Sequence, residues 1–518
     1  MNDFVKSLIV FFSCIVSCIC FSDAKPEAIF EIEKDLFPTK NKIDEIVLAN
    51  LKEKKIKPSY MASDAVMLRR VYLDLTGTIP TIEQAKAYYA DKSPQKYRNL
   101  VRKLLASDDF NIYLTMRLGD ILRVKSEFPI NLWPNAAQAY TRYIYSSVAK
   151  NKTWDTMARE MLTSSGSNFR VGQVNFYRAM QARNPQSFAN CACLSFMGMR
   201  FENFTEAERK TFVKFFESVQ LKSTKEWKEE IVMDNPLQTY SFHAEMPDGA
   251  LIVLNNSDSP RKDFAQWLTS KHNPYFAKAF ANRVWTWLVG TPIVSPVDDL
   301  NGTNLNPKLL EYLAAYFSKD FNIRALFEHI VMSRTYASSS LPREDLKEAL
   351  ENFATYKVRQ LEAEVIIDMI CKITDTGEIY ESATPEPYTL MPLKTRAVSL
   401  YDSGITTSFL EMFGRSPRDT GYASERVSEP SASQRLHLLN SSHIRNKIEA
   451  TFMRKIIDEK RNAKNFADTY LHILSRYPTP DEVAQIRNVK LTEQYKHWHL
   501  RRDIAWALIN SEEFLNRH

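Results

Sequence analysis

The stretch NPYFAKAFANRVWTWLVGTPIVSPVDDL, residues Asn273–Leu300, decides how the second half of this chain folds. Asn273 is a favourable N-cap, Pro274 suits a first helical position and Gly290 is a stop signal, so the spacing predicts a helix over residues 274–289. Apolar residues recur every four positions along it and form one face, which predicts burial: Phe276, Phe280, Val284 and Leu288.

The composition indicates a folded, mainly helical protein. The 518 residues are too many for one ordinary core, and 44% of them are hydrophobic. The net charge of +6 is too dilute over this length for a nucleic-acid-binding protein. Only 12 glycines occur, which disfavours glycine-rich nucleotide loops and turn-dense β folds. We therefore expect a mainly α, multi-helix protein of two domains.

The N-terminus reads as an export signal. Lys6 precedes an apolar run over residues 8–21, and Ala24 offers a cleavage site, which predicts a signal peptide over residues 1–24. The residues before Cys18 also resemble a bacterial lipobox, so a lipid anchor at Cys18 is the alternative. The run is short for a membrane-spanning helix. The sequence thus predicts a periplasmic, envelope or extracellular protein that meets a membrane only through that anchor.

Three of the six cysteines fall in this signal, which leaves Cys191, Cys193 and Cys371. Cys191 and Cys193 are too close in sequence for an unstrained mutual bridge, and no companion Cys or His pair completes a zinc site. We expect buried thiols, with one bridge from Cys371 to either of the other two left open.

Two similar helical units stand near the two ends of the chain. Residues 72–81 and 470–479 align without a gap, and each ends in a threonine that opens a capping box, with Gln84 and Glu482 respectively as the third helical residue. The pattern predicts two related helical caps rather than a solenoid.

Between these units a β-hairpin is expected near the domain junction. A capped helix opens at Thr205, and Pro247-Asp248-Gly249 then forms a turn between two strand-like runs. We therefore predict a helical domain over 40–222, a hairpin linker region over 223–260 and a second helical domain over 261–518. Further helices are expected in the second domain, near 307–318, 323–333 and 343–373.

The motifs resemble planctomycete-type secreted proteins that pair the domains of unknown function 1549 and 1553. In the first domain the similar segments are Arg69–Gly77 with Pro80-Thr81, and Leu104–Ser107. In the second they are 273–285, 296–299, 333–336 and 413–440. The resemblance implies export, a largely helical fold and relatives accompanied by secreted sulfatase-like proteins.

One departure from that family affects the expected chemistry. Relatives usually carry a Cys-x-x-Cys-His-like segment before the Phe-rich helix, but here Phe201–Thr205 directly follows the lead-in. The ligands for covalent haem or a thiolate–histidine metal site are therefore missing, and we expect no cofactor and no metal.

Two groups of residues are candidates for a site. Asp298 and Asp299 suit a general acid/base pair or a cation, although helix capping and a salt bridge to Arg283 would explain them equally. A second group suits a sulfated or carboxylated ligand, because guanidinium groups bind such anions in a bidentate manner, but a structural ion-pair network is the rival interpretation: Arg415, Arg418, Glu425 and Arg426, with Asn282 and Arg283 beside them. The histidines, among them His437 and His443, are expected to be isolated.

Two functions remain open from the sequence. The first is a non-catalytic envelope or extracellular protein that binds a polysaccharide or a secreted, sulfatase-like partner. The second is a hydrolase or lyase that acts on an anionic glycan, with Asp298, Asp299 and the arginines of 415–426 around one cleft. Convergence of these residues on one open pocket would favour the enzyme, whereas burial of each in its own ion pair would favour binding.

Overall fold

The computed structural model of this chain is mainly α-helical, as the sequence predicts. It describes residues 29–33, 41–384, 390–458, 466–490, 492 and 494–518. The expected signal segment and Cys18 lie outside these described residues. Among them, no helix combines the length and the apolar character needed to cross a membrane.

Nine helices precede the predicted junction: α2 (Lys42–Lys54), α3 (Asp64–Thr76), α4 (Ile82–Ala90), α5 (Lys96–Leu105), α6 (Asp108–Ile121), α7 (Pro134–Ala149), α8 (Trp154–Thr163), α9 (Pro185–Ala192) and α10 (Glu206–Lys214), counted over the described residues. Short 3-10 or π turns are η2 (Gly172–Tyr177), η3 (Cys193–Met197), η4 (Phe201–Asn203), η5 (Ala397–Ser399) and η6 (Ala423–Glu425).

The helices after the junction are α11 (Pro260–Leu268), α12 (Phe276–Val289), α13 (Pro307–Phe317), α14 (Ile323–Val331), α15 (Leu346–Glu351), α16 (Ala363–Thr374), α17 (Ser408–Met412), α18 (Ala432–Asn440), α19 (Ser442–Asp458), α20 (Phe466–Leu474), α21 (Pro480–Arg487), α22 (His497–Ile509) and α23 (Glu512–Leu515).

The strands are short and all their pairings are antiparallel. The predicted hairpin is formed by β6 (Tyr240–Glu245) and β7 (Leu251–Ser257). Beside it in sequence is a sheet of order β3-β5-β4 that the sequence reasoning missed, made of β3 (Gly166–Ser167), β4 (Val219–Ser223) and β5 (Glu230–Asp234). The other pairs are β1 (Glu31–Ile32) with β2 (Met61–Ala62), β8 (Val294–Ser295) with β9 (Thr303–Asn304), and β10 (Arg359–Gln360) with β11 (Asn516–Arg517).

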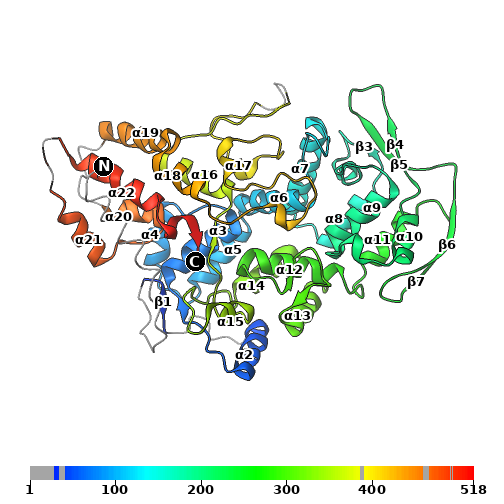
Figure 1. Ribbon diagram of the computed structural model, residues 1–518, viewed down its shortest axis with the longest axis horizontal. Helices are drawn as coiled ribbons and strands as arrows, with labels where there is room; N and C mark the ends of the chain where they lie inside the picture. Colours follow the sequence, from blue (N-terminus) through cyan, green and yellow to red (C-terminus); the bar gives the residue numbers. More distant parts are fainter. Residues whose placement is uncertain (1–28, 34–40, 385–389, 459–465, 491, 493) are drawn as a thin grey trace.

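The molecule is elongated in Figure 1, with α12 near its middle. Strands β3–β7 lie at one end with α9–α11, and α19–α22 lie at the other end. The C-terminus returns to the middle, close to α3 and α5. The last strand, β11, is therefore placed to pair with β10 rather than to extend away from the body.

The hydrophobic interior has two parts, which divide near residue 357 rather than at the hairpin. Residues 43–356 supply nearly all of the first cluster, so α12–α15 pack with the N-terminal helices. The second cluster is built mainly from residues 361–514. Helix α3 contributes to both, through Leu75 to the first and Leu73 to the second. The two parts therefore meet at the centre of the molecule.

Helix α12 forms as its sequence predicts, with one adjustment at the start. The side chain of Asn273 accepts hydrogen bonds from the backbone N–H groups of Tyr275 and Phe276, so the cap is real although the helix begins at Phe276. Gly290 ends it at φ 92°, a left-handed conformation that favours glycine. Trp285 is fully buried inside. Burial of such a side chain contributes about 1.5–3 kcal/mol.

The two repeated units also form as predicted, and they contact each other. Both capping boxes are present, at Thr81 and at Thr479. The hydroxyl group of Tyr89 at the end of α4 donates to the carbonyl oxygen of Ser475 after α20, at 2.8 Å. Arg69 in α3 donates to the carbonyl oxygen of Ile473. The repeats therefore join the beginning of the folded chain to its end.

The long helix expected over 343–373 is wrong. The structure has the short α15, an extended segment and then α16. Phe353 has φ 56°, which no right-handed helix allows, and the Tyr356 N–H donates to the carbonyl oxygen of Ser339. Arg359 and Gln360 then pair with β11. Tertiary hydrogen bonds replace the local ones here, so helical periodicity was misleading.

Candidate functional site

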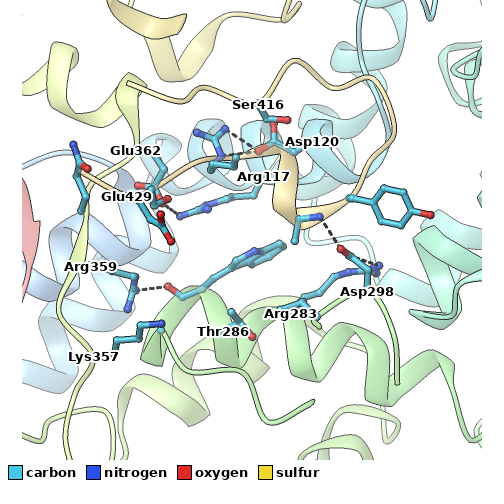
Figure 2. A pocket seen from close by; sticks show the side chains of 18 of the residues that line it. Arg117, Asp120, Arg283, Thr286, Asp298, Lys357, Arg359, Glu362, Ser416 and Glu429 are labelled. Atoms are coloured by element: carbon cyan, nitrogen blue, oxygen red, sulfur yellow. Dashed lines mark hydrogen bonds and ion pairs between the residues drawn. The ribbon is translucent and has the colours of Figure 1, made fainter. Parts of the chain in front are cut away.

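The main candidate is a central cleft of about 670 Å³, where the two parts of the interior meet. It is lined by residues of α6, α12, the segment after β8, the segment around β10, the loop between α17 and α18, and the C-terminal α23 and β11. Its charged and aromatic lining residues include Arg117, Asp120, Arg283, Trp287, Asp298, Lys357, Arg359, Glu362, Arg426 and Glu429. Figure 2 places Lys357, Arg359 and Glu429 at one side of the view, and Arg283 with Asp298 at the other.

Helix α12 forms one wall because of its spacing. Positions 283, 286, 287 and 290 lie within two turns on one helix face, and all four line the cleft. Trp287 is half-buried there, while its neighbour Leu288 points into the core. The stripe that buries α12 and the face that lines the cleft are thus adjacent sides of one helix.

Asp298 lines the cleft but is fully engaged in structural contacts. It is 3% exposed, and one oxygen lies 3.7 Å from the guanidinium group of Arg283. The other oxygen accepts a hydrogen bond from the backbone N–H of Ala423 at 2.7 Å. The Arg283 group also donates to the carbonyl oxygens of Leu194 and Ser195 in η3. Burial lowers the pKa of Arg283, against the opposing effect of Asp298.

Asp299 and Asn282 do not reach the cleft. Asp299 accepts from the side-chain amide of Asn203, so the two adjacent aspartates point to different neighbours. Asn282 is fully buried, donates to the carbonyl oxygen of Val294 and accepts from two backbone N–H groups of the turn after α12. The Asp298–Asp299 pair is therefore not a joint acid/base unit in this geometry.

The arginines of the loop form a buried ion-pair network. Arg426 makes a bidentate pair with Glu364, at 2.7 and 3.0 Å, and also contacts Asp120. Arg418 pairs with Asp120 at 2.9 Å, and Arg415 lies 3.4 Å from Glu364. Burial alone would raise the pKa of Glu364, but the arginine charges, above all Arg426, hold it below its ordinary value.

Glu425 differs from these arginines because it binds backbone. Its carboxylate accepts hydrogen bonds from the N–H groups of residues 419, 420 and 421. These hydrogen bonds stabilise the loop that contains Glu425, and its carboxylate forms no ion pair with Arg426. Of the six ligand candidates, only Arg283 and Arg426 line the cleft, together with Asp298 of the catalytic candidates.

The network continues into residues that the sequence reasoning missed. Arg117 pairs with Glu362, and Arg517 lies 2.6 Å from Glu362 and 2.7 Å from Asp74. Burial opposes ionisation of Glu362, but Arg117 and Arg517 outweigh it and hold the pKa of Glu362 well below its usual range. The one sequence signal was Arg117 and Asp120, three residues apart in the second half of α6 among mostly apolar neighbours. Glu362 was missed because a continuous helix was expected over its position.

The network as a whole carries more positive than negative charge. Its members are joined by ion pairs: Arg117, Arg359, Arg415, Arg418, Arg426 and Arg517 with Asp74, Asp120, Glu362 and Glu364. Six guanidinium groups against four carboxylates leave an excess of two positive charges. Three of these arginines and two of the carboxylates line the cleft, so the network contributes net positive charge to its wall.

Two charged groups on the cleft surface are free of protein partners. Lys357 and Glu429 are exposed, and neither forms an ion pair or side-chain hydrogen bond with another described residue. Their charges cancel, and so do those of Arg283 and Asp298. Glu512 also lines the cleft but is paired with Arg435, so the positive charge at the cleft comes from the buried network. Lys357 is the group best able to contact a bound anion directly.

The histidines expected to be isolated are in fact neighbours. His437 and His443 lie 3.3 Å apart, and His443 contacts Glu378, which also pairs with Lys447 at 2.6 Å. Within the described parts of the chain, no three His, Cys, Asp or Glu side chains are arranged to hold a metal ion. The proximity arises because α18 and α19 join at a sharp bend.

The three described cysteines are free thiols, and Cys191 and Cys193 are buried. The possible bridge from Cys371 is therefore not formed. Burial raises the pKa of Cys371 to about 11, against the opposing charge of Lys447. None of the three lines the cleft.

Comparison with known families identifies the two halves of the chain. Residues 42–219 match the family described as protein of unknown function DUF1549, and residues 260–490 match the family described as protein of unknown function DUF1553. The chain therefore carries both domains in this order, which confirms the pairing expected from the motifs. No curated protein and no solved structure matches it.

Proposed function

We propose that this chain is a non-catalytic binding protein of the cell envelope or extracellular space, and that its central cleft takes an anionic polysaccharide. The ligand class is a glycan with sulfate or carboxylate groups. The signal peptide predicted over the first 24 residues supports the location, with lipid attachment at Cys18 as the alternative to cleavage after Ala24.

The observation that carries the proposal is the excess of two positive charges in the buried ion-pair network behind the wall of an open cleft. Charges in a partly buried site are screened less than those in water, so the wall attracts anions. Lys357 has no side-chain partner among the described residues and is positioned to pair with an acidic group. Trp287 offers half-buried apolar surface beside it, which suits the carbon-rich face of a sugar ring.

Binding is favoured over catalysis because the buried carboxylates are already committed. A general acid or base must exchange a proton with the substrate. Asp120 and Glu362 are held by arginines, and Asp298 is held by Arg283 and a backbone N–H group. Proton transfer by any of them would break an ion pair.

The test compares one polysaccharide in its sulfated and desulfated forms, using the purified, exported chain. Tighter binding of the sulfated form, weakened by salt and by Lys357→Glu, is expected. Lys150→Glu is the matched control, since Lys150 is exposed, has no side-chain partner in the described part of the chain and lies outside the cleft. Equal binding of the two forms would refute the proposal. Absence of binding to either form would also refute it and would leave a secreted, sulfatase-like protein as the partner to test.

The alternative is a hydrolase or lyase acting on the same anionic glycan. It is favoured by one observation, that Asp298 and Arg426 line the same cleft. Release of reducing ends from the bound glycan, lost in Asp298→Asn with binding retained, would establish the enzyme. Binding without any product under the same conditions would exclude it for that glycan.

A further inference from the structure

A second hollow of about 490 Å³ lies between α19 and α22. The two sites share no lining residue. The hollow belongs to the part of the molecule built on the second hydrophobic cluster. Its charged and aromatic lining residues are Arg445, Glu449, Tyr495, Arg502, Asp503 and Trp506.

The aromatic residues of the hollow are held in place by their neighbours. Tyr495 and Trp506 are half-buried, so part of each side chain stays accessible. The ring of Tyr495 stacks on His499 with centroids 5.6 Å apart and planes at 20°. Its hydroxyl group donates to Asp503 at 2.9 Å. Such a ring can receive a ligand without losing much side-chain freedom.

The charged residues of the hollow divide into a fixed pair and a free pair. Asp503 is fixed, because Tyr495 contacts one of its oxygens and Arg502 the other, at 2.9 Å. Arg445 and Glu449 lie four residues apart on α19, a spacing that permits an ion pair. Yet neither pairs with the other or with any other described residue, and both line the hollow.

The charges of the hollow cancel. Two arginines oppose two carboxylates, so neither an anion nor a cation is favoured overall. A ligand that both donates and accepts hydrogen bonds satisfies such a wall best. Neutral sugars have this property in every hydroxyl group, and their C–H faces pack against aromatic rings.

We propose that this hollow is a second binding site, which takes a neutral sugar unit. Arg445 donates to sugar hydroxyl groups and Glu449 accepts from them, while Tyr495 and Trp506 contact the ring. The site is independent of the proposed function of the central cleft, since it rests on different residues and on balanced rather than excess charge.

The experiment is calorimetric titration of the full chain with neutral hexasaccharides of glucose, mannose and galactose. Binding of at least one of them should be insensitive to salt and should weaken at least tenfold in Arg445→Ala and in Glu449→Ala. Arg487→Ala is the matched control, because Arg487 is exposed on nearby α21, pairs with no residue that the structure describes and lies outside the hollow. Lys357→Glu should leave this binding unchanged.

Both tested side chains are surface residues of α19, so their loss should not unfold the protein, and circular dichroism of each variant checks this. Failure of all three hexasaccharides to bind at millimolar concentration would overturn the proposal. Binding that survives both substitutions, or that Lys357→Glu abolishes, would also overturn it. Loss of the central-cleft binding leaves this result unaffected, so the two proposals fail separately.

Discussion

Arg517, the second-last residue of the chain, lies 2.7 Å from Asp74 of α3, and both side chains are fully buried. This contact ties the C-terminal strand to the first domain. Arg517 also pairs with Glu362, so one guanidinium group joins three segments that are distant in sequence. The fold of the centre therefore depends on the last residues of the chain.

Replacement of Arg517 should destabilise the protein strongly. Arg517→Ala leaves two buried carboxylates with fewer partners, although Asp74 keeps Tyr336 and Tyr356 as donors. Loss of one member of a buried ion pair costs roughly 3 kcal/mol or more. Thermal unfolding measures the effect. Arg487→Ala, on the surface, should change stability by less than about 0.5 kcal/mol, and a similar small effect in Arg517→Ala would contradict the role of the contact.

The charge of Lys357 should set the salt dependence of glycan binding. Lys357→Ala removes the free cation of the central cleft without breaking any contact within the described protein. We expect a roughly three- to tenfold weaker affinity for a sulfated polysaccharide at low salt and a smaller slope of affinity against salt concentration. An unchanged salt slope, equal to that of Lys150→Ala, would show that Lys357 does not contact the ligand.

Gly290 should tolerate no side chain. Its φ is 92°, and an added Cβ would lie 2.6 Å from Arg359 and 3.1 Å from Lys357. Gly249, at φ 79° in the hairpin turn, has nothing within 4 Å of an added Cβ and serves as the control. Gly249→Ala should cost about 1 kcal/mol from backbone conformation alone. Gly290→Ala should cost clearly more and should also weaken binding in the cleft. Equal losses of stability in the two variants would show that the side chains of Arg359 and Lys357 move away from the added Cβ at little energetic cost.

Asp368 should make stability depend on pH in the weakly acidic range. Burial raises its pKa from 3.8 to about 6, against the opposing Arg396 charge and the N–H groups of Ala397 and Val398. Because the folded-state pKa is the higher one, the protonated form favours folding. This stabilising effect is complete below about pH 4 and is lost as pH rises through about 6.

The test is the difference in stability between Asp368→Asn and the unmodified protein, from urea unfolding at pH 4 to 7. Asparagine does not titrate, so the variant should gain on the order of 3 kcal/mol relative to the unmodified protein across this range. Asp481→Asn, which changes an exposed carboxylate on α21, should show no such trend. A difference that stays constant with pH for Asp368→Asn would refute the expectation.

Local signals predicted several elements well because their causes are local. The Asn273 cap, the Gly290 stop and the capping boxes at Thr81 and Thr479 each depend on residues within one helical turn. The hairpin turn at Pro247–Gly249 is of the same kind. Where the expected helix over 343–373 failed, the backbone found partners far away in sequence, at Ser339 and in β11.

The candidate site was only partly predictable for the same reason. Arg283 and Asp298 stand close in sequence, and the salt bridge weighed between them is present. Arg426 was singled out, but its partners Asp120 and Glu364 come from other elements, and nothing in their local pattern indicates the pairing. His437 and His443 were read as isolated because contact across the α18–α19 bend has no periodic signature.

The sequence by itself determined the helical class of this protein, the caps of its main helices, the hairpin and the pairing of its two domains, because these depend on residue types at short spacing. The tertiary structure alone decided which charges meet. A buried guanidinium group needs partners, and these come from whichever segments the fold brings to it. The excess positive charge of the central network and the balanced charge of the second hollow therefore exist only once the chain has folded.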